Sequence, residues 1–69
     1  MTTATEIMMT ARNANEAYAR AEAESVDADQ QWDNEATLYR FTDGSVLAIN
    51  GGQVNAYADE DAAAVDFPN

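Results

Sequence analysis

The side chains of this sequence that could do chemistry are almost all carboxylates. The 69 residues include 13 Asp and Glu, three Arg, and no Lys, His or Cys. Without His, Cys and Lys the chain has no Ser-His or Cys-His nucleophile, no Schiff base, and no thiolate or imidazole ligand for zinc. A folded chain of this length also has only a small core, which rarely encloses a site that excludes water. We therefore expect a protein that is not an enzyme and that needs no cofactor.

Carboxylates at regular spacing could also bind a divalent cation, and the best match to a calcium loop begins at Asp27. Asp27, Asp29 and Asp33 stand at positions 1, 3 and 7 of that loop. However, Trp32 replaces the glycine needed at position 6, and Leu38 replaces the acid needed at position 12. A pair of carboxylates for glycoside hydrolysis would need a cleft about 5–10 Å across, which a chain this short is not expected to form. We therefore predict no metal site and no hydrolase site.

The net charge excludes two further classes of partner. Three cations and 13 acids give 3 − 13 = −10 at pH 7. Nucleic-acid affinity comes chiefly from Lys and Arg neutralising phosphates, so we expect no direct nucleic-acid binding, and anionic membranes repel the chain for the same reason. The charge favours a basic protein surface or a cation as partner. Alternatively it serves solubility, for which a net charge of roughly 2–8 suffices in a small domain, or it reflects a halophilic source.

The first element that positions these acids is a helix near residues 14–25. Asn13 is a suitable N-cap, and Glu16 follows three positions later, as in a capping box. Alanines at helical spacing predict a face that lies close to a sheet, with Tyr18 as its one large buried side chain.

Residues 4–11 fit either the start of a helix or a strand. In a continuous helix Met9 would project about 200° away from Ile7, onto the charged face. In a strand these two apolar side chains share one face, because side chains alternate with a period of two. The pattern therefore favours a strand near residues 4–11.

Residues 36–57 predict an antiparallel β-meander. The turn residues Asp43-Gly44 and Asn50-Gly51-Gly52 separate three runs that are rich in strand-forming residues, namely 36–41, 45–49 and 53–57. Residues 25–35, which precede the meander, are expected to form an ordered loop. The predicted fold class is α+β, a single domain over residues 1–69 in the order β-α-β-β-β. One helix packs on one face of the meander, and the other face is polar.

The acidic C-terminal segment, residues 58–69, has two possible structures. It is either a solvated tail or a short helix that Asp59 caps and that docks Val65 and Phe67 on the sheet. The sequence shows no signal peptide and no run of about 20 apolar residues, so we expect a soluble, intracellular protein.

The density of carboxylates is itself a candidate binding feature. Duplex DNA carries one negative charge per roughly 1.7 Å of its axis, and a protein can imitate that field with Asp and Glu on a rigid surface. Trp32 lies within the first of two acidic blocks, where it is either a cap on the core or an interface anchor. The predicted partner-binding residues are Glu22, Glu24, Asp27, Asp29, Asp33, Glu35, Asp59, Glu60 and Asp61.

In these features the chain resembles the small, strongly acidic, cysteine-free anti-CRISPR proteins that act as DNA mimics. The features are the acidic block 22–35, the run 59–61, and the hairpin 38–47. The resemblance implies an inhibitor that acts in the cytoplasm of a bacterial host cell and occupies the basic DNA-binding groove of a CRISPR effector complex. A monomer is favoured over an oligomer. The alternative is a small accessory or structural protein of a phage or plasmid, whose charge mainly serves solubility and which could be an oligomer subunit. A divalent-cation binder ranks third.

Overall fold

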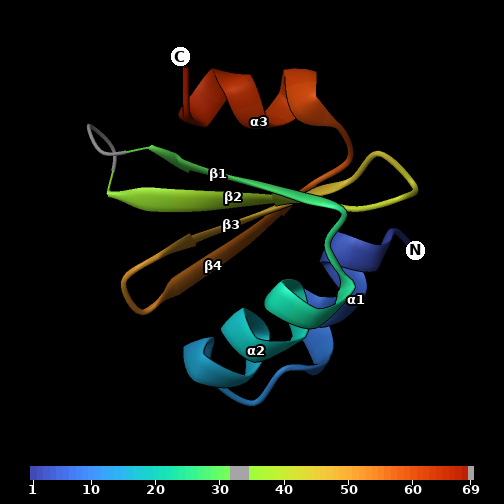
Figure 1. Ribbon diagram of the computed structural model, residues 1–69, viewed down its shortest axis with the longest axis vertical. Coiled ribbons are helices and arrows are strands. Elements are labelled where there is room, and N and C mark those ends of the chain that lie inside the picture. Colours follow the sequence, from blue (N-terminus) through green and yellow to red (C-terminus); the bar gives the residue numbers. More distant parts are fainter. Residues whose placement is uncertain (32–34, 69) are drawn as a thin grey trace.

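The computed structural model of the chain describes residues 1–31 and 35–68, which form a small, compact α+β domain (Figure 1). The elements are α1 (Thr3–Thr10), α2 (Ala14–Glu24), β1 (Asp27–Gln31), β2 (Ala36–Arg40), β3 (Val46–Asn50), β4 (Gln53–Tyr57) and α3 (Glu60–Asp66). The predicted α+β class is confirmed. The predicted order β-α-β-β-β is wrong, because the chain runs α-α-β-β-β-β-α. None of the helices within the described ranges has the length and apolar character that crossing a bilayer requires.

The predicted strand at residues 4–11 is wrong, since the chain there forms helix α1. Thr2 is its N-cap and accepts a hydrogen bond from the Thr5 N–H at 3.2 Å. Ile7 is fully buried against the sheet, while Met9 is 64% exposed. The exposure of Met9, which had favoured a strand, is tolerated in the last turn of a short helix. Helix α1 ends at Thr10, and α2 begins separately after its own N-cap.

The predicted helix near residues 14–25 is confirmed as α2, Ala14–Glu24. Its N-cap is Asn13, whose side chain accepts from the Glu16 N–H at 2.8 Å. The expected role of Tyr18 is wrong, because this side chain is half exposed. Its ring meets that of the buried Tyr39 edge-on, with centroids 6.3 Å apart, so Tyr39 on β2 supplies the large core side chain.

The sheet is a four-stranded antiparallel meander in the order β1-β2-β3-β4. The three predicted strands correspond to β2, β3 and β4 and are confirmed to within one residue at each end. Gly44 at φ 86° and Gly51 at φ 58° take the left-handed conformation in the two predicted turns. The loop expected at residues 25–35 is wrong for its first part, where β1 pairs along its whole length with β2.

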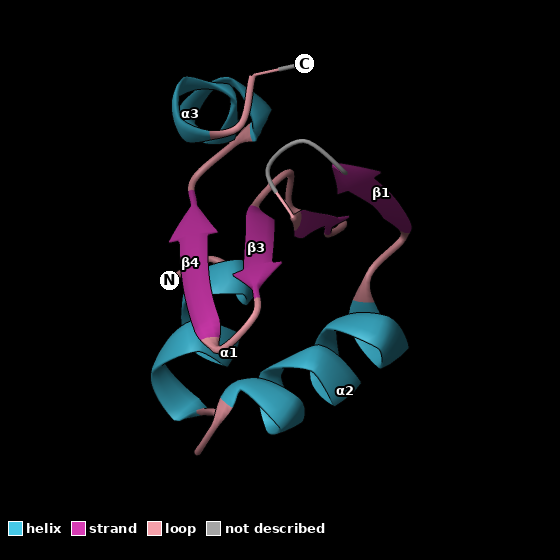
Figure 2. Ribbon diagram, turned by 90° about the vertical axis from the view of Figure 1, so that its left-hand side faces the viewer, coloured by secondary structure: helices cyan, strands magenta, loops and turns pink. Residues whose placement is uncertain are grey.

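Each face of the sheet carries a hydrophobic core. Helices α1 and α2 lie on one side of the sheet and α3 on the other (Figure 2). On the side of α1 and α2 the core includes Ile7, Tyr39 and Leu47. The opposite face, expected to be polar, is partly covered by α3, whose Ala63 packs with Val46. The second core explains why this short chain needs a C-terminal helix at all, since Leu38, Val46 and Ala48 would otherwise be exposed.

Of the two structures expected for residues 58–69, the chain adopts the helix. Asp59 is its N-cap, and its side chain accepts from the Ala62 N–H at 2.8 Å. Phe67 packs on the sheet, as that alternative predicted, and its ring meets the Tyr57 ring edge-on. The docking of Val65 is wrong, since that side chain is 81% exposed.

The first turn of α1 is held by a loop 40 residues away in the sequence. Asp43 Oδ2 accepts hydrogen bonds from the N–H of Thr3, at 2.8 Å, and from its hydroxyl, at 3.1 Å. Asp43 Oδ1 accepts from the N–H and the hydroxyl of Ser45, and the buried Ser45 Oγ in turn accepts from the Ala4 N–H at 3.1 Å. These bonds satisfy amides that a helix N-terminus would otherwise leave unpaired. We call Asp43, Ser45 and the first turn of α1 the α1 clasp.

The α1 clasp predicts a specific loss of stability in acid. The hydroxyl of Ser45 and the N–H of Thr3 hold the pKa of Asp43 well below its usual range. A depressed folded-state pKa stabilises the fold above the unfolded-state pKa of about 4, and that contribution is lost as the pH falls below it. We expect Asp43→Asn to be less stable than the wild type at pH 7, and we expect the gap to narrow at pH 3. Urea unfolding of both proteins at the two pH values measures this, and a constant gap would contradict it.

Candidate functional site

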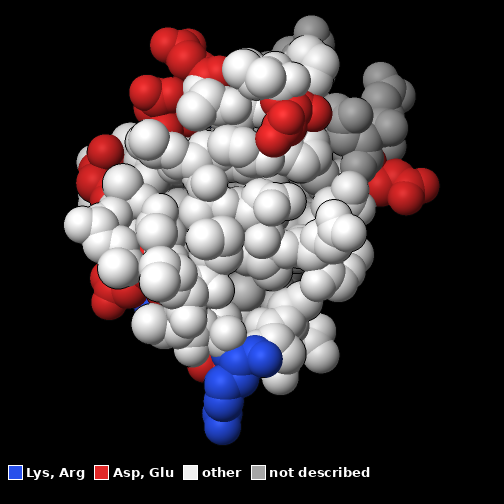
Figure 3. Space-filling model, turned by 180° about the vertical axis from the view of Figure 1, so that it is seen from behind, with Lys and Arg blue, Asp and Glu red and all other residues white. Residues whose placement is uncertain are grey.

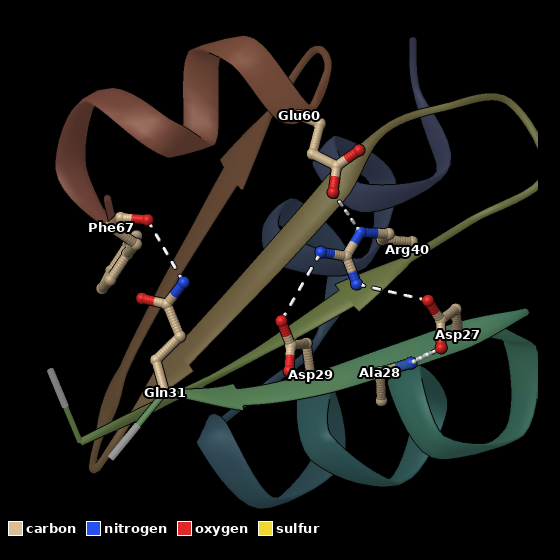
Figure 4. A network of polar contacts seen from close by, with 7 residues as sticks. All are labelled: Asp27, Ala28, Asp29, Gln31, Arg40, Glu60 and Phe67. Carbon is tan, nitrogen blue, oxygen red and sulfur yellow. Dashed lines mark hydrogen bonds and ion pairs between the residues drawn. The ribbon is translucent and has the colours of Figure 1, made fainter. Parts of the chain in front are cut away.

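The centre of the candidate site is Arg40, the last residue of β2. Its half-buried guanidinium contacts three carboxylates, two from β1 and one from α3 (Figure 4). The Nε atom lies 2.6 Å from Glu60 Oε1, Nη1 lies 3.3 Å from Asp27 Oδ2, and Nη2 lies 3.8 Å from Asp29 Oδ2. We call these four residues the Arg40 cluster.

The local fold explains why these groups meet. The register of β1 on β2 places Asp27 directly opposite Arg40. Asp29 lies two residues further along β1 and therefore on the same face of the sheet. Glu60 arrives from the other direction, because α3 begins immediately after its N-cap Asp59.

Two further acids flank Glu60 in the chain. The carboxylate of Asp59 is held by its capping bond, and Asp61 is exposed in the first turn of α3. We call Asp27, Asp29, Asp59, Glu60 and Asp61, together with Arg40, the acidic patch. Its formal charge is 1 − 5 = −4. Four of its five carboxylates have a partner, three in Arg40 and one in the capping bond of Asp59. Asp27 also accepts a hydrogen bond from the Ala28 N–H at 3.0 Å.

The remaining predicted residues do not join the acidic patch. Glu22 and Glu24 lie on α2, which packs on the opposite face of the sheet. Glu35 precedes β2, at the end of the strand remote from Arg40, roughly 15 Å away at about 3.3 Å per residue. The predicted residues Trp32 and Asp33 lie outside the described residues.

The two acids of α2 have local partners of their own. Glu24 pairs with Arg20 at 3.5 Å, and the Tyr18 hydroxyl donates to Glu22 at 3.2 Å. Burial raises the pKa of the Tyr39 phenol to about 12, and the negative charge of Glu22 adds to this. Both carboxylates therefore have polar partners within the fold, away from the acidic patch.

Sequence reasoning missed Arg40 as the organiser of the site. The sequence offers little signal for it, because its three acidic partners lie 13, 11 and 20 residues away in the chain. Across residues 1–31 and 35–68, no group of three or more acidic side chains is arranged to hold a metal ion. The three carboxylates that pair with Arg40 remain 49–66% exposed to solvent.

The charge is distributed unevenly over the molecule. On the side opposite the view of Figure 1, the described residues leave a broad centre without charge, with acids at the rim and an arginine at the lower end (Figure 3). No protein-family model, curated protein or solved structure matches this chain.

Proposed function

We propose that this protein is a non-enzymatic inhibitor that presents the acidic patch to the basic DNA-binding groove of a nucleic-acid-binding complex, with a CRISPR effector as the specific candidate. The observation that carries the proposal is the Arg40 cluster. One guanidinium holds Asp27, Asp29 and Glu60, from a strand and a helix, in a single array.

Preorganisation is what distinguishes such an array from a flexible acidic tail. A mobile carboxylate loses side-chain entropy when a partner orders it, whereas one already held by Arg40 or by a helix cap loses less. The free oxygens of these carboxylates remain exposed and can accept hydrogen bonds from the Lys and Arg side chains of a groove that binds phosphate. Long-range attraction to such a groove would speed association and make it sensitive to salt.

A second candidate function is that of an accessory protein of a phage or plasmid, in which the charge mainly serves solubility. It is favoured by the acids that lie away from the acidic patch, such as Glu6 and Glu16, and by the part of the patch charge that Arg40 neutralises. If this alternative is right, every surface carboxylate contributes about equally to solubility, and none has a specific role in binding.

Displacement of DNA tests the proposal. Purified CRISPR effector complexes of several types would be equilibrated with a fluorescently labelled target duplex, and the protein would be added while anisotropy is recorded. We expect at least one complex to release its duplex, with an inhibition constant that rises as salt is added, because salt screens the contacts. If the folded protein displaced DNA from none of them even at low salt, the proposed function would be wrong.

A further inference from the structure

The outer edge of β4 differs from the opposite edge of the sheet in carrying no charge. The sheet order makes β1 and β4 the two edge strands. β1 presents Asp27 and Asp29, whereas Gln53–Tyr57 reads Gln-Val-Asn-Ala-Tyr. Proteins commonly block an edge with charge, proline or a bulge, because an open edge can pair with another strand. Strand β4, which is described in full, has none of the three.

Val54 and Ala56 hold the outward-facing backbone groups of this edge. Asn50 and Gln53 flank a two-residue turn, so they form a hydrogen-bonded pair, and such pairs then alternate along an antiparallel ladder. Gln53 and every second residue after it therefore bond to β3. The N–H and C=O groups of Val54 and Ala56 point the other way, and no backbone bond from outside the sheet reaches them within the described residues.

The surface around this edge is also free of charge. Figure 2 places β4 on the side that faces away from the viewer in Figure 1, so Figure 3 looks onto it. Helix α1, which contacts β4, carries the apolar side chain of Met8, which is 38% exposed. Met8 points away from α2, because it lies about 200° around the helix from Thr10, whose hydroxyl accepts a hydrogen bond from Arg20 of α2.

We propose that this edge pairs with a second copy of the chain, with β4 antiparallel to β4 of the partner subunit. A two-fold axis at Asn55 places Val54 opposite Ala56 of the partner subunit. Each of the two such pairs exchanges two backbone hydrogen bonds, which gives four across the axis. Asn55 then lies directly opposite Asn55 of the partner subunit, where the two amide side chains can bond to each other.

Charge is the reason for choosing a second copy as the occupant. With a net charge of −10 each, two copies repel wherever acids meet acids, which favours a monomer on every acidic face. This repulsion is weakest at the β4 edge, because the residues of β4 and the centre of the surface around it carry no charge. The same neutrality gives a basic segment nothing to recognise there. The resulting eight-stranded sheet would carry its two acidic patches at opposite ends, whether or not they bind an effector.

Sedimentation velocity of the protein alone tests the dimer. We expect the apparent mass to rise from 7.5 kDa toward twice that value between micromolar and millimolar concentration. Salt should strengthen the dimer, because the Debye length falls to about 3 Å at 1 M and the remaining repulsion is screened. Salt would instead weaken the binding of a basic groove to the acidic patch. Because the sedimentation experiment contains no effector, a failure of the dimer proposal can be distinguished from a failure of the proposed inhibition.

Two variants locate the contact. Ala56→Pro removes an outward N–H that makes no bond to β3, so proline is tolerated at this position of an edge strand and the monomer should still fold. Ala56→Ser keeps that N–H and serves as the control. Asn55→Asp alters an exposed side chain and sets two carboxylates face to face across the axis. We expect both test variants to remain at 7.5 kDa where the wild type and the control dimerise.

Three results would overturn the proposal. The first is a wild type that stays monomeric at millimolar concentration and 1 M salt. The second is a dimer that persists in both Ala56→Pro and Asn55→Asp, which would place the interface elsewhere. The third is a monomeric wild type whose Val54 and Ala56 amide resonances shift when an extended peptide of alternating Val and Thr is added, which would assign the edge to a foreign strand.

Discussion

Replacing Ser45 with alanine is expected to lower the free energy of unfolding by about 1–3 kcal/mol. Ser45 is fully buried, and its hydroxyl both donates to Asp43 and accepts from the Ala4 N–H. Ser45→Ala leaves that N–H unpaired in a buried site, which costs more than the net loss of a hydrogen bond. In a domain of this size each kcal/mol corresponds to about 4–8 °C in Tm.

Thermal and urea unfolding measure the effect, with Ser25→Ala as the matched control. Ser25 is half-buried after α2, where its N–H rather than its hydroxyl makes the C-capping bond. We expect the control to change stability by less than about 0.5 kcal/mol. Equal losses in the two variants would show that the α1 clasp contributes nothing particular to stability.

The second large effect is expected on inhibition. Asp27→Asn, Asp29→Asn and Asp61→Asn combined remove three charges from the acidic patch. We expect the inhibition constant in the DNA-displacement assay to rise roughly 3- to 160-fold, on the basis of about 0.2–1 kcal/mol for each of the three exposed charge contacts. Stability should change little, because each of these side chains is exposed.

A matched triple variant separates position from net charge. Glu6→Gln, Glu16→Gln and Asp66→Asn also change the charge from −10 to −7, since −10 + 3 = −7, but none of these residues belongs to the acidic patch. We expect this control to inhibit nearly as well as the wild type. If the two triple variants lost inhibition equally, total charge rather than the acidic patch would determine binding.

Local signals in the sequence predicted the elements whose structure is determined locally. Asn13 and the alanines that follow it specify α2, and two glycine turns delimit the strands of the meander. These features act within a few residues, through capping, helical periodicity and positive φ. The capping residue Asp59 supported the short C-terminal helix as one of the two structures expected for residues 58–69.

Elements that depend on distant partners could not be predicted in this way. β1 contains a single apolar residue, Ala28, too few to indicate a strand by alternation, and it is a strand because β2 offers it a continuous ladder of hydrogen bonds. Helix α1 has a local N-cap in Thr2, but the N–H groups of Thr3 and Ala4 bond to Asp43 and Ser45, about 40 residues away. The helix and strand propensities of residues 4–11 contain no information about the bonds that Asp43 and Ser45 make to this segment.

The candidate site was predicted only in part for the same reason. Acid density identified Asp27, Asp29 and Glu60, but the same criterion also included Glu22, Glu24 and Glu35, which the fold places elsewhere. The distinction depends on Arg40, whose partners are set by strand register and by the return of the chain through α3.

The most direct test of the proposed inhibition maps the bound surface by NMR. Backbone amide spectra of the labelled protein would be recorded alone and with the effector from which it displaces DNA. We predict that the amides of residues 27–29, 40 and 59–61 shift or broaden first, and that those at the centre of the charge-free face do not. Changes centred on that charge-free face, or spread evenly over the molecule, would contradict the claim that the acidic patch contacts the groove.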